Sequence, residues 1–178
     1  GRSNRELDRL ATTDEMTGAS NYRAFRAGLE KWYHKSAPNN LPLSLAMINI
    51  DYFYEYNLYY GQDMGNNTIT RVAHLIMAEA IRENEVVARI NGAEFAVLLP
   101  GTTCHGARTL MENVRSKVLG QSIEHLRSGH SGQVTLSIGI CCAPLNGDMT
   151  IRNLISKAEF ALRQAKKKGR GCVAVVDN

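Results

Sequence analysis

The sequence predicts a single α/β domain with a mixed central β-sheet flanked by helices. Short apolar segments that suit buried strands alternate with longer segments whose apolar residues recur every three to four positions. Two of the strand-like segments are separated by Asn91 and Gly92, which favours a β-hairpin because both residues accept positive φ. A hairpin within an otherwise alternating order of helices and strands indicates a sheet of mixed direction.

The composition narrows the function classes. The 178 residues, 44% of them hydrophobic, can bury one sizeable core, as expected of a single domain. The 21 Lys and Arg residues are offset by 17 Asp and Glu, so the net charge of +4 predicts no general nucleic-acid surface. No apolar run approaches the roughly 20 residues of a membrane span, and there is no signal-peptide pattern. We therefore expect a cytoplasmic segment without membrane contact, whether or not its parent protein is membrane-anchored.

Cysteine and histidine spacing argues against disulfide and metal chemistry. The four cysteines show no CxxC spacing, and the adjacent Cys141 and Cys142 are expected on opposite faces of a strand. We expect neither a disulfide nor a zinc site, in keeping with a reducing cytoplasm. The histidines lack metal-ligand spacing, and surface or ordinary helical positions are expected for His34, His74, His105, His125 and His130.

The N-terminal segments predict two helices. In residues 5–13, Leu7 and Leu10 are spaced to share a helix face, which indicates the end of a linker helix from a missing upstream region. After a turn-rich segment, Asn21 is placed to cap an amphipathic helix that ends in the breaking segment 36–40.

The central segments predict a buried strand, a helix and the hairpin. Residues 43–51 form a nearly continuous apolar run that ends in the carboxylate of Asp51, as expected of a strand buried on both faces. An aromatic and polar stretch, residues 52–67, precedes a helical pattern over residues 69–80. The next elements are two strands joined by the Asn91–Gly92 turn, at residues 86–90 and 94–99.

The C-terminal part returns to alternating elements. We expect, in order, helix 105–119, strand 134–142, helix 151–168 and strand 172–176. Gly169 and Gly171 follow the last helix, as the preference for glycine after a helix C-terminus predicts.

Six motifs, taken in order along the chain, resemble those of GGDEF domains, the catalytic domains of bacterial diguanylate cyclases. The signature GG[DE]EF corresponds to Asn91, Gly92, Ala93, Glu94 and Phe95. The other matches are DEMTGASNYR at 14–23, NIDYF at 49–53, the residues Asn57, Gly61, Gly65 and Asn66, SIG at 137–139, and AKKKGR at 165–170. The resemblance implies a domain at residues 14–178, preceded by the end of a linker helix at residues 1–13.

The resemblance also implies a fold and an activity. The fold is similar to the palm of adenylyl cyclases and polymerases, with a ferredoxin-like core. In the family, two GTP-loaded domains face each other and form cyclic di-GMP, while Mg or Mn ions bridge the triphosphate and help to activate the attacking ribose hydroxyl.

Two departures from the family pattern predict that this chain is inactive. The first metal-binding Asp of the family is Asn49 here, and the third signature residue, normally acidic, is Ala93. Hard cations need oxygen ligands with negative charge, so we expect no metal site, no resident cofactor and no catalytic residue in the degenerate signature. Asp51 and Glu94 keep their carboxylates, but the resemblance gives Asp51 a mainly structural role and assigns Glu94 no settled one.

Nucleotide-binding positions are partly kept. Asn57 matches the family residue that hydrogen-bonds the guanine edge, and Asn66 replaces an Asp, so its neutral amide offers one good acceptor. Lys166 and Arg170 match the basic pair that contacts the triphosphate. A lysine of the family has become Tyr54, which removes one positive contact. The aromatic residues of the 52–67 stretch are expected to pack beneath the pocket, with base stacking as the alternative.

A second family site is also altered. Arg82 and Glu85 lie at the spacing of the inhibitory RxxD motif that binds cyclic di-GMP, with Glu in place of Asp. Arg82 can still bind a guanine edge, whereas the alternative is a surface ion pair between the two side chains.

Three function classes follow. The leading hypothesis is a non-catalytic signalling module that binds GTP or cyclic di-GMP weakly, or regulates a neighbouring upstream sensor domain through homodimerisation. The second is a residually active cyclase with a metal site built from Asn49, Glu94 and the Ile50 carbonyl. The third is a protein-interaction domain without any ligand.

Overall fold

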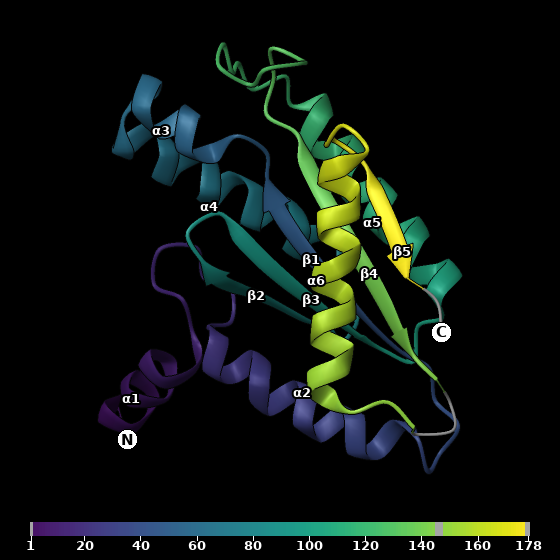
Figure 1. Cartoon of the computed structure of the whole chain (residues 1–178). Coiled ribbons are helices and arrows are strands. Elements are labelled where there is room, and N and C mark those ends of the chain that lie inside the picture. The colour runs from purple at the N-terminus through teal and green to yellow at the C-terminus, as the bar shows by residue number, and fades with distance from the viewer. Residues whose placement is uncertain (1, 145–147, 177–178) are drawn as a thin grey trace.

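A five-stranded mixed sheet forms the centre of the chain in a computed structural model, which describes residues 2–144 and 148–176 (Figure 1). The strand order is β2-β3-β1-β4-β5, in which only the β4–β5 pair is parallel. The strands are β1 (Leu43–Ile50), β2 (Val86–Asn91), β3 (Glu94–Pro100), β4 (Leu136–Ala143) and β5 (Val173–Val176). The predicted mixed α/β sheet is confirmed.

Helices cover both faces of this sheet. Within the described residues they are α1 (Arg2–Thr12), α2 (Tyr22–Ser36), α3 (Phe53–Tyr60), α4 (Gln62–Glu79), α5 (Cys104–Gly120) and α6 (Ile151–Lys167). Alternate residues of β1 face opposite cores: Met47 packs with residues of α2 and α6, whereas Ile48 packs with residues of α4 and α5. The prediction of a strand buried on both faces is therefore confirmed. None of the described helices has the length and hydropathy needed to cross a membrane.

A close contact fixes α6 against the sheet. A Cβ atom on Gly139 of β4 would lie 2.0 Å from the backbone nitrogen of Leu162. Only glycine lets the backbones of strand and helix approach this far, so this residue sets the position of α6 and of the segment that follows it.

Several predicted element ends are confirmed and others are corrected. Asn21 caps α2, since its side chain accepts a hydrogen bond from the Ala24 amide at 2.9 Å. The helix expected from residue 69 begins earlier, at Gln62, as α4. The aromatic stretch before it forms a separate helix, α3, which was not expected. The hairpin turn also shifts by one residue. Asn91 ends β2 opposite Glu94, and Gly92, with φ +38°, is the first turn residue.

Two expectations about individual side chains are wrong. Cys104 and Cys142 form a disulfide with a Cα–Cα distance of 5.7 Å, although no disulfide was expected. The two residues are 38 positions apart, and only the packing of α5 on β4 makes them neighbours. His125, expected at the surface or on a helix, is fully buried in the connection between α5 and β4. The opposite orientation of Cys141 and Cys142 is confirmed, because they pack against different cores.

Candidate functional site

An open cavity of about 510 Å³ lies where β1 ends, bordered by α3 and the β2–β3 turn. Helix α3, which borders it, is at the upper left in Figure 1. The residues that line it are Asn49, Ile50, Tyr52, Phe53, Tyr54, Glu55, Asn57, Gly92, Ala93 and Arg170. Several sequence-predicted site residues therefore come together in one place.

The metal-position residues Asn49 and Ala93 meet at this cavity, as expected. Asn49 pairs with Glu94 across β1 and β3, and the Ile50 amide donates a hydrogen bond to the Ala93 carbonyl at 3.1 Å. The side chains of Asn49 and Ala93, which the family resemblance places at metal-binding positions, are a neutral amide and a methyl group. Among the described residues, no three or more His, Cys, Asp or Glu side chains are grouped so that they could hold a metal ion.

Asp51, directly after β1, is buried and fully engaged. Its Oδ1 accepts from the Ser137 hydroxyl at 2.6 Å, and its Oδ2 accepts from the Thr135 hydroxyl at 2.7 Å and the Gly171 amide at 3.0 Å. The Arg170 guanidinium lies 3.8 Å from Oδ1. Three donors and a cation compensate for the burial of this charge, so the carboxylate joins β1, β4 and the segment after α6.

Arg170 reaches the cavity through an unusual backbone path. Gly169, Arg170 and Gly171 all have positive φ, +65° at the arginine, a conformation that costs a non-glycine residue free energy. This path places the guanidinium 4.4 Å from the centre of the Tyr52 ring. The arginine is thus held between a buried carboxylate and an aromatic face, with its outer side toward the cavity.

Asn57 of α3 carries an unsatisfied polar atom. Its Oδ1 is buried and has no hydrogen-bond partner, a costly arrangement that usually marks a missing partner. Gly65 of α4 makes room for it, because a Cβ there would lie 1.8 Å from that oxygen. Asn66 follows Gly65 on α4 but is not among the residues that line the cavity, so the two asparagines do not share its wall.

Lys166 and Glu94 lie behind the cavity wall rather than on it. Burial lowers the pKa of Lys166, as does neighbouring Arg170, while the carboxylates of Asp51 and Glu94 act in the opposite direction. Burial raises the pKa of Glu94, with a further increase from Glu159 and a partial offset from Lys166. The predicted basic pair is therefore divided: Arg170 faces the cavity, whereas Lys166 belongs to a half-buried cluster of charges.

The sequence matches the family described as "Diguanylate cyclase, GGDEF domain" over residues 11–172. The chain belongs to the GGDEF domain family. It is 34% identical over 167 residues to the probable diguanylate cyclase DgcC of Escherichia coli, and 31% identical over 164 residues to the response regulator PleD of Caulobacter vibrioides. These alignments cover 93% and 92% of this chain but only 43% and 36% of the relatives. The chain thus spans less than half the length of either relative.

Solved GGDEF structures share the fold. The coiled coil and GGDEF domain of DgcB from Caulobacter crescentus, solved in complex with c-di-GMP, superposes with a TM-score of 0.89 at 27% identity. The match covers 98% of this chain and 91% of that one. The diguanylate cyclase SiaD of Pseudomonas aeruginosa, solved with its activator SiaC, gives a TM-score of 0.82 at 28% identity, with coverage of 98% of this chain and 65% of that one. The chain is therefore a homologue of diguanylate cyclases with the GGDEF fold.

The sequence did not reveal that the loop between α5 and β4 packs against Tyr52, a residue that lines the first cavity. Buried His125 contacts the Tyr52 carbonyl through Nε2 at 2.9 Å, and a Cβ on Gly129 would lie 3.3 Å from the Tyr52 ring. The Tyr60 hydroxyl oxygen accepts a hydrogen bond from the Leu126 amide at 3.0 Å. The loop thereby positions Tyr52, whose left-handed backbone (φ +54°) starts α3. No motif marks these contacts, because they join segments about 70 residues apart.

A second cavity of about 480 Å³ contains Arg82 and Glu85. They lie in the turn between α4 and β2, opposite the N-terminal half of α5. The Glu85 carboxylate accepts a hydrogen bond from the Arg82 backbone amide at 3.0 Å, a contact different from the side-chain ion pair that was the alternative expectation. Arg82 is an exposed residue that lines this cavity.

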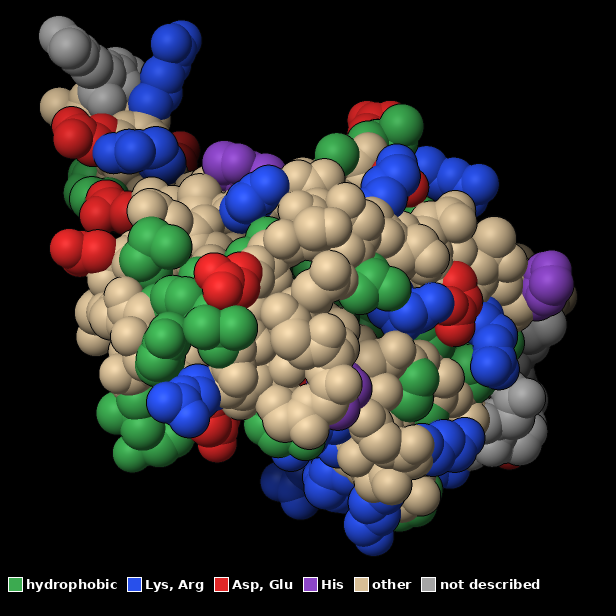
Figure 2. Space-filling view, turned by 90° about the horizontal axis from the view of Figure 1, so that it is seen from above, with side chains coloured by type: hydrophobic (Ala, Val, Ile, Leu, Met, Phe, Trp, Pro, Cys, Tyr) green, Lys and Arg blue, Asp and Glu red, His purple; other side chains and the backbone are tan. Residues whose placement is uncertain are grey.

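The surface around the first cavity divides into two parts. Figure 2 looks down on this end of the GGDEF domain; hydrophobic side chains gather at the left, and basic side chains are more numerous on the other side. Three α3 side chains are exposed by about half or more: Tyr54 at 72%, Leu58 at 70% and Tyr59 at 49%. Tyr56 of the same helix is buried and accepts the Thr68 hydroxyl at 2.9 Å. Packing thus accounts for Tyr56, but not for the exposed tyrosines.

Proposed function

We propose that this GGDEF domain does not synthesise cyclic di-GMP and acts as a regulatory module in cyclic di-GMP signalling. The observation that supports this most is that Asn49 and Ala93 line the same cavity, and both side chains are neutral. The catalytic chemistry of the family needs divalent cations held by charged oxygen ligands. Both of these charges are missing here.

The side chains of Asn49, Ala93 and Asp51 do not supply the free charged oxygen ligands that a pair of magnesium ions needs. Asn49 offers one neutral carbonyl oxygen, and Ala93 offers no side-chain oxygen. Both Asp51 oxygens already accept hydrogen bonds inside the domain. A metal at Asp51 would have to displace these donors, so we assign no catalytic step to a bound metal.

Weak guanine-nucleotide binding without metal is the ligand function that the cavity supports best. Asn57 lines the cavity with an amide side chain that can hydrogen-bond a base edge, and Arg170 supplies a guanidinium for phosphate. The two residues lie on the wall of the same cavity. Without metal, the repulsion within a triphosphate is only partly neutralised, so the affinity is expected to be low.

The catalytic proposal is tested by assaying product from GTP with Mg or Mn. We expect no cyclic di-GMP above a control without protein. The double variant Asn49→Asp, Ala93→Asp returns both carboxylates and should gain Mn binding, measured by calorimetry. A matched control is Asn113→Asp with Ala78→Asp, which adds the same charge away from this cavity. Product from the wild-type chain that disappears in Glu94→Ala would overturn the proposal in favour of a residually active cyclase.

Nucleotide binding is tested by titrating the chain with GTP. The double variant Lys166→Ala, Arg170→Ala should bind several-fold more weakly, whereas Arg163→Ala, an exposed position on α6, should bind like the wild type. Added salt should weaken binding, because phosphate contacts are screened, and a chelator should change it little. If GTP at millimolar concentration does not bind, the nucleotide-binding proposal fails. Loss of binding with chelator would instead indicate a surviving metal site.

Cyclic di-GMP at the second cavity is a second candidate ligand. The cavity has room for a compact ligand, and Arg82 presents a guanidinium that can bind the guanine edge. A titration with cyclic di-GMP should show binding that Arg82→Ala weakens at least about tenfold, the loss of one bidentate contact. Arg108→Ala, an exposed neighbour on α5 outside the cavity, is the matched control. Equal effects of the two variants would exclude specific recognition by Arg82.

The role within a larger protein belongs to the same proposal. Helix α1 presents Leu7 and Leu10, exposed by 63% and 50%, and continues toward the N-terminal end of the chain. We assign residues 1–13 to a linker from an upstream sensor domain and residues 14–178 to the degenerate GGDEF domain. Absence of binding to both GTP and cyclic di-GMP would favour the alternative of a ligand-free dimerisation domain.

A further inference from the structure

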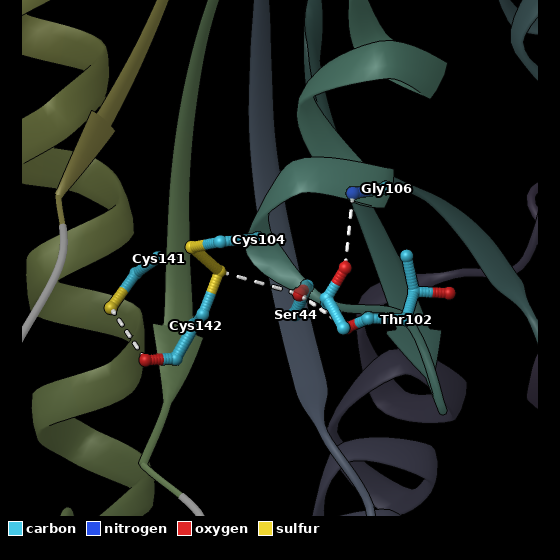
Figure 3. Close-up of a disulfide and its surroundings, with 7 residues drawn as sticks. Ser44, Thr102, Cys104, Gly106, Cys141 and Cys142 are labelled. Atoms are coloured by element: carbon cyan, nitrogen blue, oxygen red, sulfur yellow. Dashed lines mark hydrogen bonds between the residues drawn. A yellow bond between two sulfur atoms is a disulfide. The ribbon is translucent and has the colours of Figure 1, made fainter.

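The Cys104–Cys142 disulfide ties the start of α5 to β4. Cys104 is the first residue of α5, and Cys142 lies near the end of β4 (Figure 3). Both residues are partly exposed rather than buried, so a soluble reductant can reach the bond. Partly exposed disulfides are more often labile or regulatory than deeply buried ones.

Hydrogen bonds gather other groups at the same point. The Ser44 hydroxyl of β1 lies 2.7 Å from the Thr102 carbonyl, to which it donates, and 3.4 Å from the sulfur of Cys142 (Figure 3). Thr103 caps α5, because its hydroxyl oxygen accepts a hydrogen bond from the Gly106 amide at 3.2 Å. The loop before α5 and its first turn are therefore fastened to the sheet through Ser44 and the disulfide.

The fastened turn is also a wall of the second cavity. Thr102, His105 and Gly106 line the cavity, and they flank the disulfide-bonded Cys104 on both sides in the sequence. The opposite wall comes from the α4–β2 turn with Arg82 and Glu85. The disulfide joins the first wall to β4.

We propose that Cys104 and Cys142 form a redox-responsive clamp that sets the shape of the Arg82 cavity. Two-electron reduction by a dithiol breaks the S–S bond. The two electrons and two protons come from the reductant, which becomes a disulfide while Cys104 and Cys142 become thiols. The first turn of α5 then keeps only its hydrogen bonds and packing. Its greater freedom raises the entropic cost of ordering the cavity around a ligand, so reduction weakens binding there.

Linkage makes the effect reciprocal. A ligand that prefers the oxidised domain by a given factor makes the disulfide harder to reduce by the same factor. The ligand part of this inference rests on cyclic di-GMP binding at the second cavity, whereas the clamp itself does not. The two parts are tested by different measurements.

The clamp is tested by amide hydrogen exchange on the full 178-residue chain, oxidised and reduced. We expect exchange at residues 102–110 to become at least about tenfold faster on reduction, because the covalent restraint on local opening is gone. The double variant Cys104→Ser, Cys142→Ser should show the fast rates under both conditions. Cys172→Ser, which leaves the disulfide intact, should respond as the wild type does. Wild-type reduction alone gives the answer if the double variant does not fold.

The ligand arm is a cyclic di-GMP titration of both redox forms. We expect affinity at least about fivefold lower in the reduced wild type, within the usual range of allosteric coupling, and no redox effect in the double variant. Equal exchange at residues 102–110 in the two forms, or no Cys104–Cys142 link by mass spectrometry after oxidation, overturns the clamp. A clear exchange difference without any cyclic di-GMP binding supports the clamp and rejects the proposed ligand.

Discussion

The two cavities of this domain are held together by different means. Around the first, a buried carboxylate, three hydrogen-bond donors and Arg170 join the strand ends to the segment after α6. Around the second, a disulfide and Ser44 fasten the start of α5 to the sheet. The first thus depends on polar satisfaction of one buried charge, and the second on a covalent bond that chemistry can open.

The comparison separates the shape of a site from its chemistry. Asn49 and Ala93 border the first cavity, yet none of the hydrogen bonds to Asp51 involves their side chains. The carboxylates of the family can therefore be lost without removing the contacts that form the cavity. Under the proposed function, this domain keeps the architecture of a GGDEF site without the charges needed for metal.

The largest expected effect is the loss of stability when Asp51, which joins the segments around the first cavity, is replaced. Asp51→Ala should lower the free energy of unfolding by about 3–5 kcal/mol, because it leaves buried donors and Arg170 without their acceptor. Urea denaturation measures this change. The control is Asp63→Ala, an exposed residue in the first turn of α4, which should cost no more than about 1 kcal/mol through the helix dipole. Similar losses in both variants would show that Asp51 does not hold this region together.

Reduction of the disulfide should have the next largest effect. A closed loop of 38 residues corresponds to about 4 kcal/mol of stabilisation in the chain-entropy description. Urea denaturation with and without a dithiol should show this loss in the wild type and in Cys172→Ser. It should show no effect of reductant in the Cys104→Ser, Cys142→Ser variant. A wild-type stability that does not respond to reductant would mean that the disulfide does not restrain the unfolded chain.

A smaller effect concerns the space that Gly65 leaves for Asn57. Gly65→Ala should destabilise the domain by about 1–3 kcal/mol, as overpacking usually does, because the new Cβ would overlap the Asn57 oxygen. The displaced amide should also weaken GTP binding. Gly120→Ala, at a helical glycine with open space around it, should be neutral or slightly stabilising. Unchanged stability and GTP binding in Gly65→Ala would show that Asn57 moves aside without cost.

The smallest effect is a pH dependence from Glu94. Its pKa is raised above 4.5 in the folded domain, first by burial and then by Glu159. Between the unfolded and folded pKa values the folded state therefore binds more protons than the unfolded state, and stability falls as pH rises through this window. Glu94→Gln cannot ionise there, so its free energy of unfolding should increase relative to wild type as pH rises from about 4 to 7.

The expected difference for Glu94→Gln is under about 1 kcal/mol, because the side chain is partly exposed and water screens it. Urea denaturation at several pH values measures it. Glu83→Gln, an exposed position in the α4–β2 turn, is the control and should show no such trend. A constant difference between Glu94→Gln and wild type across this pH range would remove Glu94 as the cause.

The sequence by itself determined the order of the strands and of the helices other than α3, and it predicted where Asn49 and Ala93 lie. Periodicity and turn residues are local properties, so β1, the β2–β3 hairpin and the Asn21 cap could be predicted from neighbouring residues alone. The ordered motifs also predicted that Asn49 and Ala93 lie close together; both line the first cavity, and the Ile50 amide donates a hydrogen bond to the Ala93 carbonyl. The function assigned to these positions stays a proposal.

Only the tertiary structure decided which distant groups share an environment. The disulfide joins residues 38 positions apart, and buried His125 contacts Tyr52 across 73 positions. Lys166 and Arg170 are neighbours in sequence, yet only Arg170 lines the cavity, because Gly169 and Gly171 redirect the chain after α6 with positive φ. Such contacts depend on how helices pack on the sheet, and sequence periodicity specifies which face of an element is buried but not which distant residue lies against it.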